Sequence, residues 1–245
     1  MLRREKPSCW KCHSSLRSRS VVNALSICLF RDSITVNEFP SDSRRGIALS
    51  DEEGVVKRLA RSLNYENTYY HKEPLLDLRN IDGNQKESLD YIVCSEVLEH
   101  IVQPIEDATR NIFHLLKKGG FAIITVPYNT GGPQDGPTIE HFPDLYDFDI
   151  FRSGNHEQRG VQDSQVLVNI TKDGERQEFA DLAFHGGEGV NLEMRQFTKK
   201  SLTDLLLESG FSRVENIDSD FKEFGIEFLG EFEGQVDKEP VVAWK

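Results

Sequence analysis

The amino-acid sequence predicts an α/β fold built on a mostly parallel, buried sheet. A continuous apolar run over residues 89–94 precedes a helical apolar pattern over 105–116, and a second apolar run follows over 121–126. A strand, a helix and a strand in this order form a βαβ unit, whose strands are parallel and covered on both faces. Two more apolar segments, 214–217 and 241–244, are expected to be the last strands.

Length and composition indicate a globular protein with a sizeable core. The chain has 245 residues, 38% of them hydrophobic, and its 29 basic and 41 acidic side chains give a net charge of −12. An acidic balance argues against a protein that binds nucleic acid with its whole surface, so we expect no nucleic-acid partner. No apolar segment approaches the roughly 20 residues of a membrane span, so we expect no membrane partner. The chain has only four cysteines, which favours a reducing, cytoplasmic setting.

The N-terminal segment differs from the rest in charge. Its first 20 residues hold six basic side chains and one acid, together with Cys9 and Cys12. A cysteine pair at this spacing is half of a structural zinc site, which needs four ligands, so we expect no metal here. The basic charge suits either a nucleic-acid arm or a solvated terminus. We divide the chain into this segment with its helix, residues 1–30, and a main domain, residues 31–245.

The first half of the main domain alternates short strands and helices. Residues 34–39 and 46–50 are expected to be strands, because each is apolar and ends at a proline or an acid. The apolar spacing over residues 52–63 predicts a helix, and residues 68–71 are expected to be extended.

The central βαβ unit has clear boundaries. Residues 95–102 are expected to form a turn with one helical turn, and Pro104 suits the first position of the next helix. Lys117 and Lys118 suit the negative end of that helix, which Gly119 and Gly120 are expected to close.

Residues 128–195 interrupt this alternation and are expected to be an insertion lying over the sheet. A turn signal at Lys172–Gly174 separates two arms of a β-hairpin, residues 166–170 and 178–184. After the insertion, Thr198 caps a helix that ends at Gly210.

Three segments resemble a known family. They are Leu89–His100, with its LEH turn, Leu115–Pro127, with its LKKGG turn, and Gln196–Phe211. In this order they resemble the class I S-adenosylmethionine-dependent methyltransferases of the type-11-like kind, over residues 46–127 and 190–245. The resemblance implies a Rossmann-like, doubly wound sheet of seven strands with an antiparallel last strand. It also implies S-adenosyl-L-methionine as cofactor.

The resemblance assigns cofactor-binding roles to residues after the predicted strands, where ligands of open parallel sheets bind. Asp51 would accept hydrogen bonds from the ribose hydroxyls, or would cap the helix that follows it. Asp77 and Leu78 would lie near the adenine amino group, or would form a surface turn. Ser95 and Glu96 follow the fourth strand and would line the cofactor.

One part of the family pattern is missing. The family's glycine-rich loop after the first strand, which lets the backbone approach the cofactor, has no counterpart in this sequence. Glu38 stands where the leading acid of that loop would be, and Phe39–Arg45 follows it without a glycine. Either the first strand and helix are shortened or they lie upstream of Met1.

Histidines supply the candidates for acceptor chemistry. A methyl transfer to oxygen or nitrogen often needs a base near neutral pH, which histidine provides. His141 and His185 lie in the insertion beside acidic or flexible residues, and His100 follows Glu99; each is either part of the substrate site or of local polar structure.

The expected function is methyl transfer from S-adenosylmethionine to a small-molecule or sugar-type acceptor. The first alternative is a methyltransferase fold that has lost its cofactor and acts as a binding protein. The second is a nicotinamide-dependent oxidoreductase, disfavoured because the GxGxxG pattern does not occur.

Overall fold

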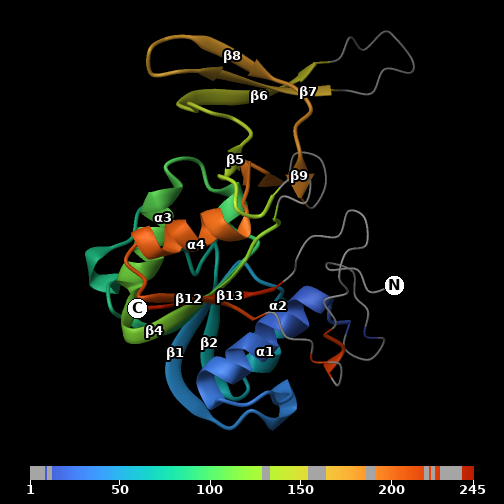
Figure 1. Cartoon of the computed structure of the whole chain (residues 1–245), viewed down its shortest axis with the longest axis vertical. Coiled ribbons are helices and arrows are strands. Elements are labelled where there is room, and N and C mark those ends of the chain that lie inside the picture. Colours follow the sequence, from blue (N-terminus) through green and yellow to red (C-terminus); the bar gives the residue numbers. More distant parts are fainter. Residues whose placement is uncertain are drawn as a thin grey trace.

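The structure, a computed structural model, describes residues 9, 13–128, 133–153, 164–185, 191–217, 221, 224–226 and 239–245. Its centre is a six-stranded sheet with the strand order β12-β13-β4-β3-β1-β2 (Figure 1). The strands are β1 (Asp42–Leu49), β2 (Leu63–Thr68), β3 (Leu89–Ser95), β4 (Leu116–Thr125), β12 (Arg213–Asn216) and β13 (Val241–Trp244). Strands β1 to β4 are parallel, and β13 is antiparallel to both of its neighbours. The predicted fold class is therefore confirmed.

Helices cover both faces of the sheet. The helices α1 (Leu16–Phe30) and α2 (Glu53–Leu59) pack on one face, and α3 (Ile105–Leu115) and α4 (Lys199–Glu208) on the other (Figure 1). Strand β3 shows the division, because successive side chains of a strand point to opposite faces. Ile92 and Cys94 lie in the core under α3 and α4, whereas Tyr91 and Val93 lie under α1 and α2. The N-terminal helix thus shares its core with the sheet.

The βαβ unit is confirmed, with one boundary moved. Strand β4 begins at Leu116, which pairs with Leu89 of β3. Residues 117–120 therefore belong to a strand and do not end a helix. Gly119 adopts a positive φ of 79° and donates its N–H to the carbonyl of Lys245, so this irregular strand start is tied to the end of the chain.

The strand predicted over residues 34–39 is wrong. This segment contains a 3-10 turn, η1 (Val36–Glu38), in which the Glu38 carboxylate accepts hydrogen bonds from the N–H and hydroxyl of Thr35. The reciprocal cap competes with the extended conformation and prevails here. Glu38 precedes β1 by four residues and so lies at the amino end of that strand. Strand β1, which covers most of the strand predicted over residues 46–50, is therefore the first strand of the described sheet and lies between β3 and β2.

The predicted helix over residues 52–63 is shorter than expected. Helix α2 ends at Leu59, and Leu63 already begins β2, where it pairs with Asp42 of β1. Helix α4 begins as predicted, because Thr198 and Ser201 form a capping box, and Gly210 follows with a φ of 110°.

The insertion forms its own small sheet at one end of the molecule (Figure 1). Its strands β6 (Asp147–Ser153), β7 (Ser164–Ile170) and β8 (Arg176–Phe179) are antiparallel, and β7 and β8 form the predicted hairpin. Two short ladders lie below it. They pair β5 (Ile139–Glu140) with β11 (Arg195–Gln196), and β9 (Phe184–His185) with β10 (Asn191–Leu192). Among the described helices, none has the length and apolar character to cross a membrane.

Substituting Gly46 by Ala should destabilise the fold strongly. A Cβ atom at Gly46 would lie 2.0 Å from the ring of Tyr91, whose side chain is fully buried. Overpacking of this severity should lower the free energy of unfolding by about 3 kcal/mol or more. Gly54→Ala is the matched control, since nothing lies within 4 Å of its Cβ position and alanine favours the helix. Urea denaturation of both variants checks this, and equal midpoints would contradict the packing described.

Candidate functional site

A cavity of about 530 Å³ lies at the carboxyl ends of the parallel strands. From β1 the chain passes to β2 on one side and then crosses to β3 on the other, which makes the edge between β1 and β3 a topological switch point. Open α/β sheets bind ligands at such points. The cavity is lined by Leu49, Ser50, Thr68, Tyr69, Tyr70, His71, Leu76, Asp77, Leu78, Arg79, Glu96, Val97, His100, Ile101, Val102, Asn191, Leu192 and Met194.

Three of the predicted cofactor-binding residues line this cavity. They are Asp77, Leu78 and Glu96. The segment with Asp77 lies beyond β2, where Tyr69 and Leu75 form an isolated parallel bridge in place of a predicted third strand. The Asp77 carboxylate accepts a hydrogen bond from the backbone N–H of Arg79. Asp77 therefore also has the contact expected of a residue in a surface turn. Glu96 adopts a positive φ of 57° directly after β3.

Ser95 and Asp51 lie beside the cavity and are held by an arginine. The Arg17 guanidinium donates to the Ser95 hydroxyl at 2.6 Å and lies 3.7 Å from the Asp51 carboxylate. Asp51 is not among the lining residues, and its side chain is only 4% exposed. The cap of α2 is Glu52, so Asp51 is not that helix cap either. The ribose role of Asp51 stays a prediction, while its ion pair is a structural feature that the sequence did not indicate.

The connection between β1 and α2 is a short turn at the carboxyl end of β1. It consists of Ser50, Asp51 and Glu52, and Ser50 adopts a positive φ of 55°. The Asn67 side chain bridges it by accepting from the Asp51 N–H and donating to the Asp51 carbonyl. Side-chain hydrogen bonds thus fix a short turn that contains no glycine at the carboxyl end of β1. Glu38 lies at the other end of β1 and does not take part in this edge.

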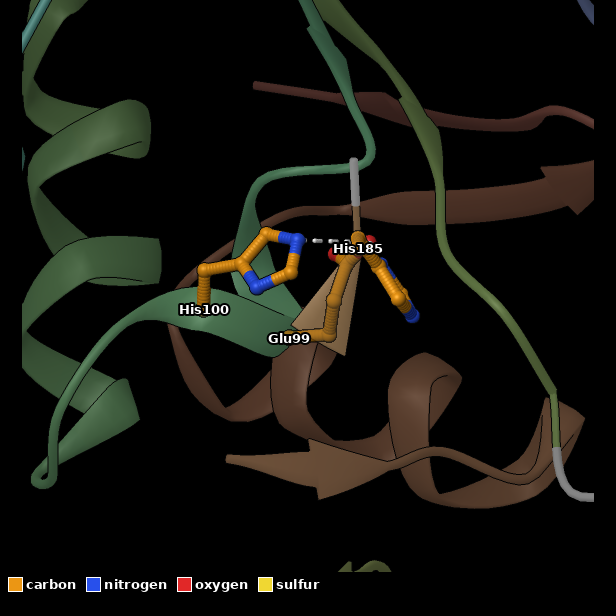
Figure 2. A group of neighbouring side chains, drawn as sticks. All are labelled: Glu99, His100 and His185. Carbon is orange, nitrogen blue, oxygen red and sulfur yellow. Dashed lines mark ion pairs between the residues drawn. The ribbon is translucent and has the colours of Figure 1, made fainter. Parts of the chain in front are cut away.

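The structure brings the three predicted histidines together around two buried carboxylates. His100 and Glu99 lie on η3 (Leu98–His100), and His185 of β9 faces them (Figure 2). The ring centroids of His100 and His185 are 4.8 Å apart. Glu193, which follows β10, contacts His185 Nε2 at 2.7 Å and His141 Nε2 at 2.9 Å. These five residues form a histidine–glutamate cluster: Glu99, His100, His141, His185 and Glu193. The insertion supplies the last three of them.

Hydrogen bonds and burial set the protonation of His100 and Glu193. His100 Nδ1 lies 2.8 Å from the carbonyl oxygen of Leu192, which can only accept, so Nδ1 carries the proton. Burial lowers the pKa of His100, so this ring is neutral near pH 7. Burial also raises the pKa of Glu193, but the hydrogen bonds from the two histidines and Gln196 outweigh it and hold that pKa well below its usual range. Glu193 is therefore ionised.

Arg195 connects the insertion to the backbone on either side of Glu99 and His100. Its side chain is fully buried, and its guanidinium contacts the Glu140 carboxylate at 2.6 Å. It also donates to the carbonyls of Leu98 and Ile101, which flank Glu99 and His100 in the chain. The backbone of η3 is thereby held against the insertion.

Sequence reasoning missed the roles of Glu99, Glu193, Arg17 and Arg195. The sequence offered two local indications of these roles. Glu99 is next to His100, and Glu193 lies two residues before Arg195. The contacts themselves join residues far apart in the chain, such as Arg17 with Ser95.

Comparisons with known proteins identify one domain. Residues 47–124 match the family model described as a methyltransferase domain, within the range of the predicted resemblance. No curated protein matches the chain in sequence.

Solved structures with a similar arrangement have low sequence identity. The amino pentose methyltransferase CalS10 from Micromonospora echinaspora shares 12% identity with a TM-score of 0.47, covering 94% of this chain and 92% of its own. The 1,6-didemethyltoxoflavin-N1-methyltransferase from Burkholderia thailandensis shares 11% with a TM-score of 0.46, covering 94% and 77%.

Proposed function

Since the chain contains a class I S-adenosylmethionine-dependent methyltransferase domain, we propose that it transfers the cofactor's methyl group to a small-molecule or sugar-type acceptor beside the histidine–glutamate cluster. The observation that carries this proposal is the position of the cavity. It opens at the switch point of the sheet and shares His100 with the cluster. A cofactor in the cavity and an acceptor at the cluster would therefore be neighbours.

The lining of the cavity suits this cofactor. Its volume of about 530 Å³ lies within the range of small-molecule sites. Apolar side chains such as Leu78 and Ile101 suit an adenine ring, and the Asp77 carboxylate can accept a hydrogen bond from the uncharged adenine amino group. The Glu96 carboxylate suits the positive charge of the sulfonium or of the ammonium group. When bound, S-adenosylmethionine supplies a methyl group on a sulfur that is a good leaving group.

The chain's own contribution would be to position and activate the acceptor. Holding two reactants in line supplies much of the rate enhancement of such a transfer. Among the candidate histidines, His100 lines the cavity, and His141 and His185 are tied to Glu193. The cluster thus stands where an acceptor hydroxyl or amine would give up its proton.

Calorimetric titration tests the proposal. The chain should bind both S-adenosylmethionine and its demethylated product, and Asp77→Ala should raise both dissociation constants about 10-fold, which corresponds to about 1.4 kcal/mol. Asp107→Ala is the control, because this exposed acid lies on α3 and forms an ion pair with Arg110.

Absence of heat with either ligand at millimolar concentration would contradict the proposal and favour the cofactor-less binding protein. An unchanged affinity of the Asp77 variant, with its thermal stability intact, would remove Asp77 from the adenine site.

A further inference from the structure

We propose that Glu99, His100 and His185 form a binding site for a divalent transition-metal cation at the wall of the cavity. Their potential ligand atoms all lie within 4.8 Å of one another (Figure 2). The Glu99 carboxylate is 3.6 Å from His100 Nε2 and 3.8 Å from His185 Nδ1. Two ligands bound tetrahedrally at about 2.1 Å from a zinc ion would be about 3.4 Å apart. The two distances from Glu99 exceed this value by about 0.2 Å and about 0.4 Å, and all the ligand atoms lie within 4.8 Å of one another, so a small closure of the two rings would complete the site.

The protonation pattern makes these atoms electron-pair donors. His100 Nδ1 donates its proton to the Leu192 carbonyl, which leaves the lone pair of Nε2 facing Glu99. His185 Nε2 lies 2.7 Å from the Glu193 carboxylate and donates to it, and Nδ1 is the ring nitrogen that faces Glu99. Since metal ligands bind in their deprotonated form, a cation at this position would take the lone pairs of His100 Nε2 and His185 Nδ1 together with the Glu99 carboxylate.

The surroundings have the features of a metal site. Histidine ligands of metals usually donate their second N–H to a carboxylate or a backbone carbonyl, which fixes the ring. His185 has the carboxylate of Glu193 in this role, and His100 has the carbonyl of Leu192. Glu193 is itself held by His141 and Gln196. Glu99 is fully buried, and a cation beside it would offset the cost of burying its charge.

The donor set indicates the class of cation. Two imidazole nitrogens and one carboxylate suit zinc, cobalt or ferrous iron better than magnesium or calcium, which prefer oxygen ligands. Three protein ligands leave a coordination position for another group, as in catalytic zinc sites. Since His100 also lines the cavity, we infer that this position receives an oxygen atom of the acceptor, whose hydroxyl would become more acidic on the cation. This last step rests on the proposed function.

Cobalt titration of the full chain tests the site. The Cys9→Ser, Cys12→Ser variant is used throughout, so that the N-terminal cysteines do not bind the probe. After removal of metals with a chelator, Co²⁺ should bind at one equivalent per chain with visible ligand-field absorption, and Zn²⁺ should displace it, whereas millimolar Mg²⁺ should not. His185→Ala and Glu99→Gln should each weaken Co²⁺ binding at least about 100-fold.

His114→Ala is the matched control, since this exposed histidine lies on α3. His185 is 37% exposed, so its variant is expected to fold even if Glu99→Gln does not. Equal Co²⁺ affinity of the His185 and His114 variants would overturn the proposal, as would the lack of a one-equivalent site in the parent. Titration of the metal-free chain with S-adenosylhomocysteine distinguishes failure of the cation site from failure of the proposed function. If the chain binds this ligand but has no cobalt site, the cation site is rejected and the proposed function is retained.

Discussion

Arg195→Met should lower the free energy of unfolding by about 3–5 kcal/mol. The substitution removes a fully buried guanidinium and leaves the Glu140 carboxylate without that partner. It also deprives the carbonyls of Leu98 and Ile101 of their donor. A buried group that loses its partner costs more than an exposed one, since water cannot replace the lost bond.

Urea denaturation measures this loss, with Arg110→Met as the control. Arg110 is 52% exposed and pairs with Asp107 one turn away in α3, so its loss should cost about 0.5 kcal/mol at most. A cost below about 1 kcal/mol for Arg195→Met would show that Arg195 does not tie η3 to the insertion.

Glu193→Gln should reduce both cation affinity and methyl transfer about 10- to 100-fold. One carboxylate oxygen of Glu193 accepts from His141 and Gln196, and the other from His185. An amide has only one oxygen, and its NH₂ group would face a ring nitrogen that now donates. If that nitrogen is His185 Nε2, the proton moves to Nδ1 and the lone pair toward Glu99 is lost.

The matched control for this second prediction is Glu178→Gln. Glu178 is a half-exposed residue of β8 that pairs with Arg176, away from the cavity lining. The variants are compared by Co²⁺ titration and by kcat and KM separately. A positioning role predicts a loss in cation affinity with the S-adenosylhomocysteine affinity unchanged. A loss of thermal stability alone, with Co²⁺ affinity retained, would contradict the role given to Glu193.

The sequence predicted the parts of the fold that have a clear local period. The buried run of β3 and the apolar stripe of α3 follow from their spacing, and their connection required parallel strands. The prediction failed over residues 34–39, where Ile34 and Val36 alternate as in a strand. There the hydrogen bonds between Thr35 and Glu38 stabilise a 3-10 turn, and the alternation alone did not reveal them.

The site was predictable only in part, because it depends on long-range pairing. The end of β3 indicated Glu96 at the cavity, since carboxyl ends of parallel strands meet at one edge. Asp77 also lines the cavity, although the strand predicted before it is only an isolated bridge. His141 and His185 were selected for their chemistry, but their meeting depends on two ladders, β5 with β11 and β9 with β10, of only two residues each. Such short strands carry no periodic signal.

The most direct test of the account is a crystal structure of the full chain with S-adenosylhomocysteine. We expect the ligand to occupy the cavity between the ends of β1 and β3. Its adenine should lie beside Leu78, and its sulfur should lie nearer to His100. Ligand density elsewhere on the molecule, or a cavity that stays free of ligand at saturating concentration, would contradict it.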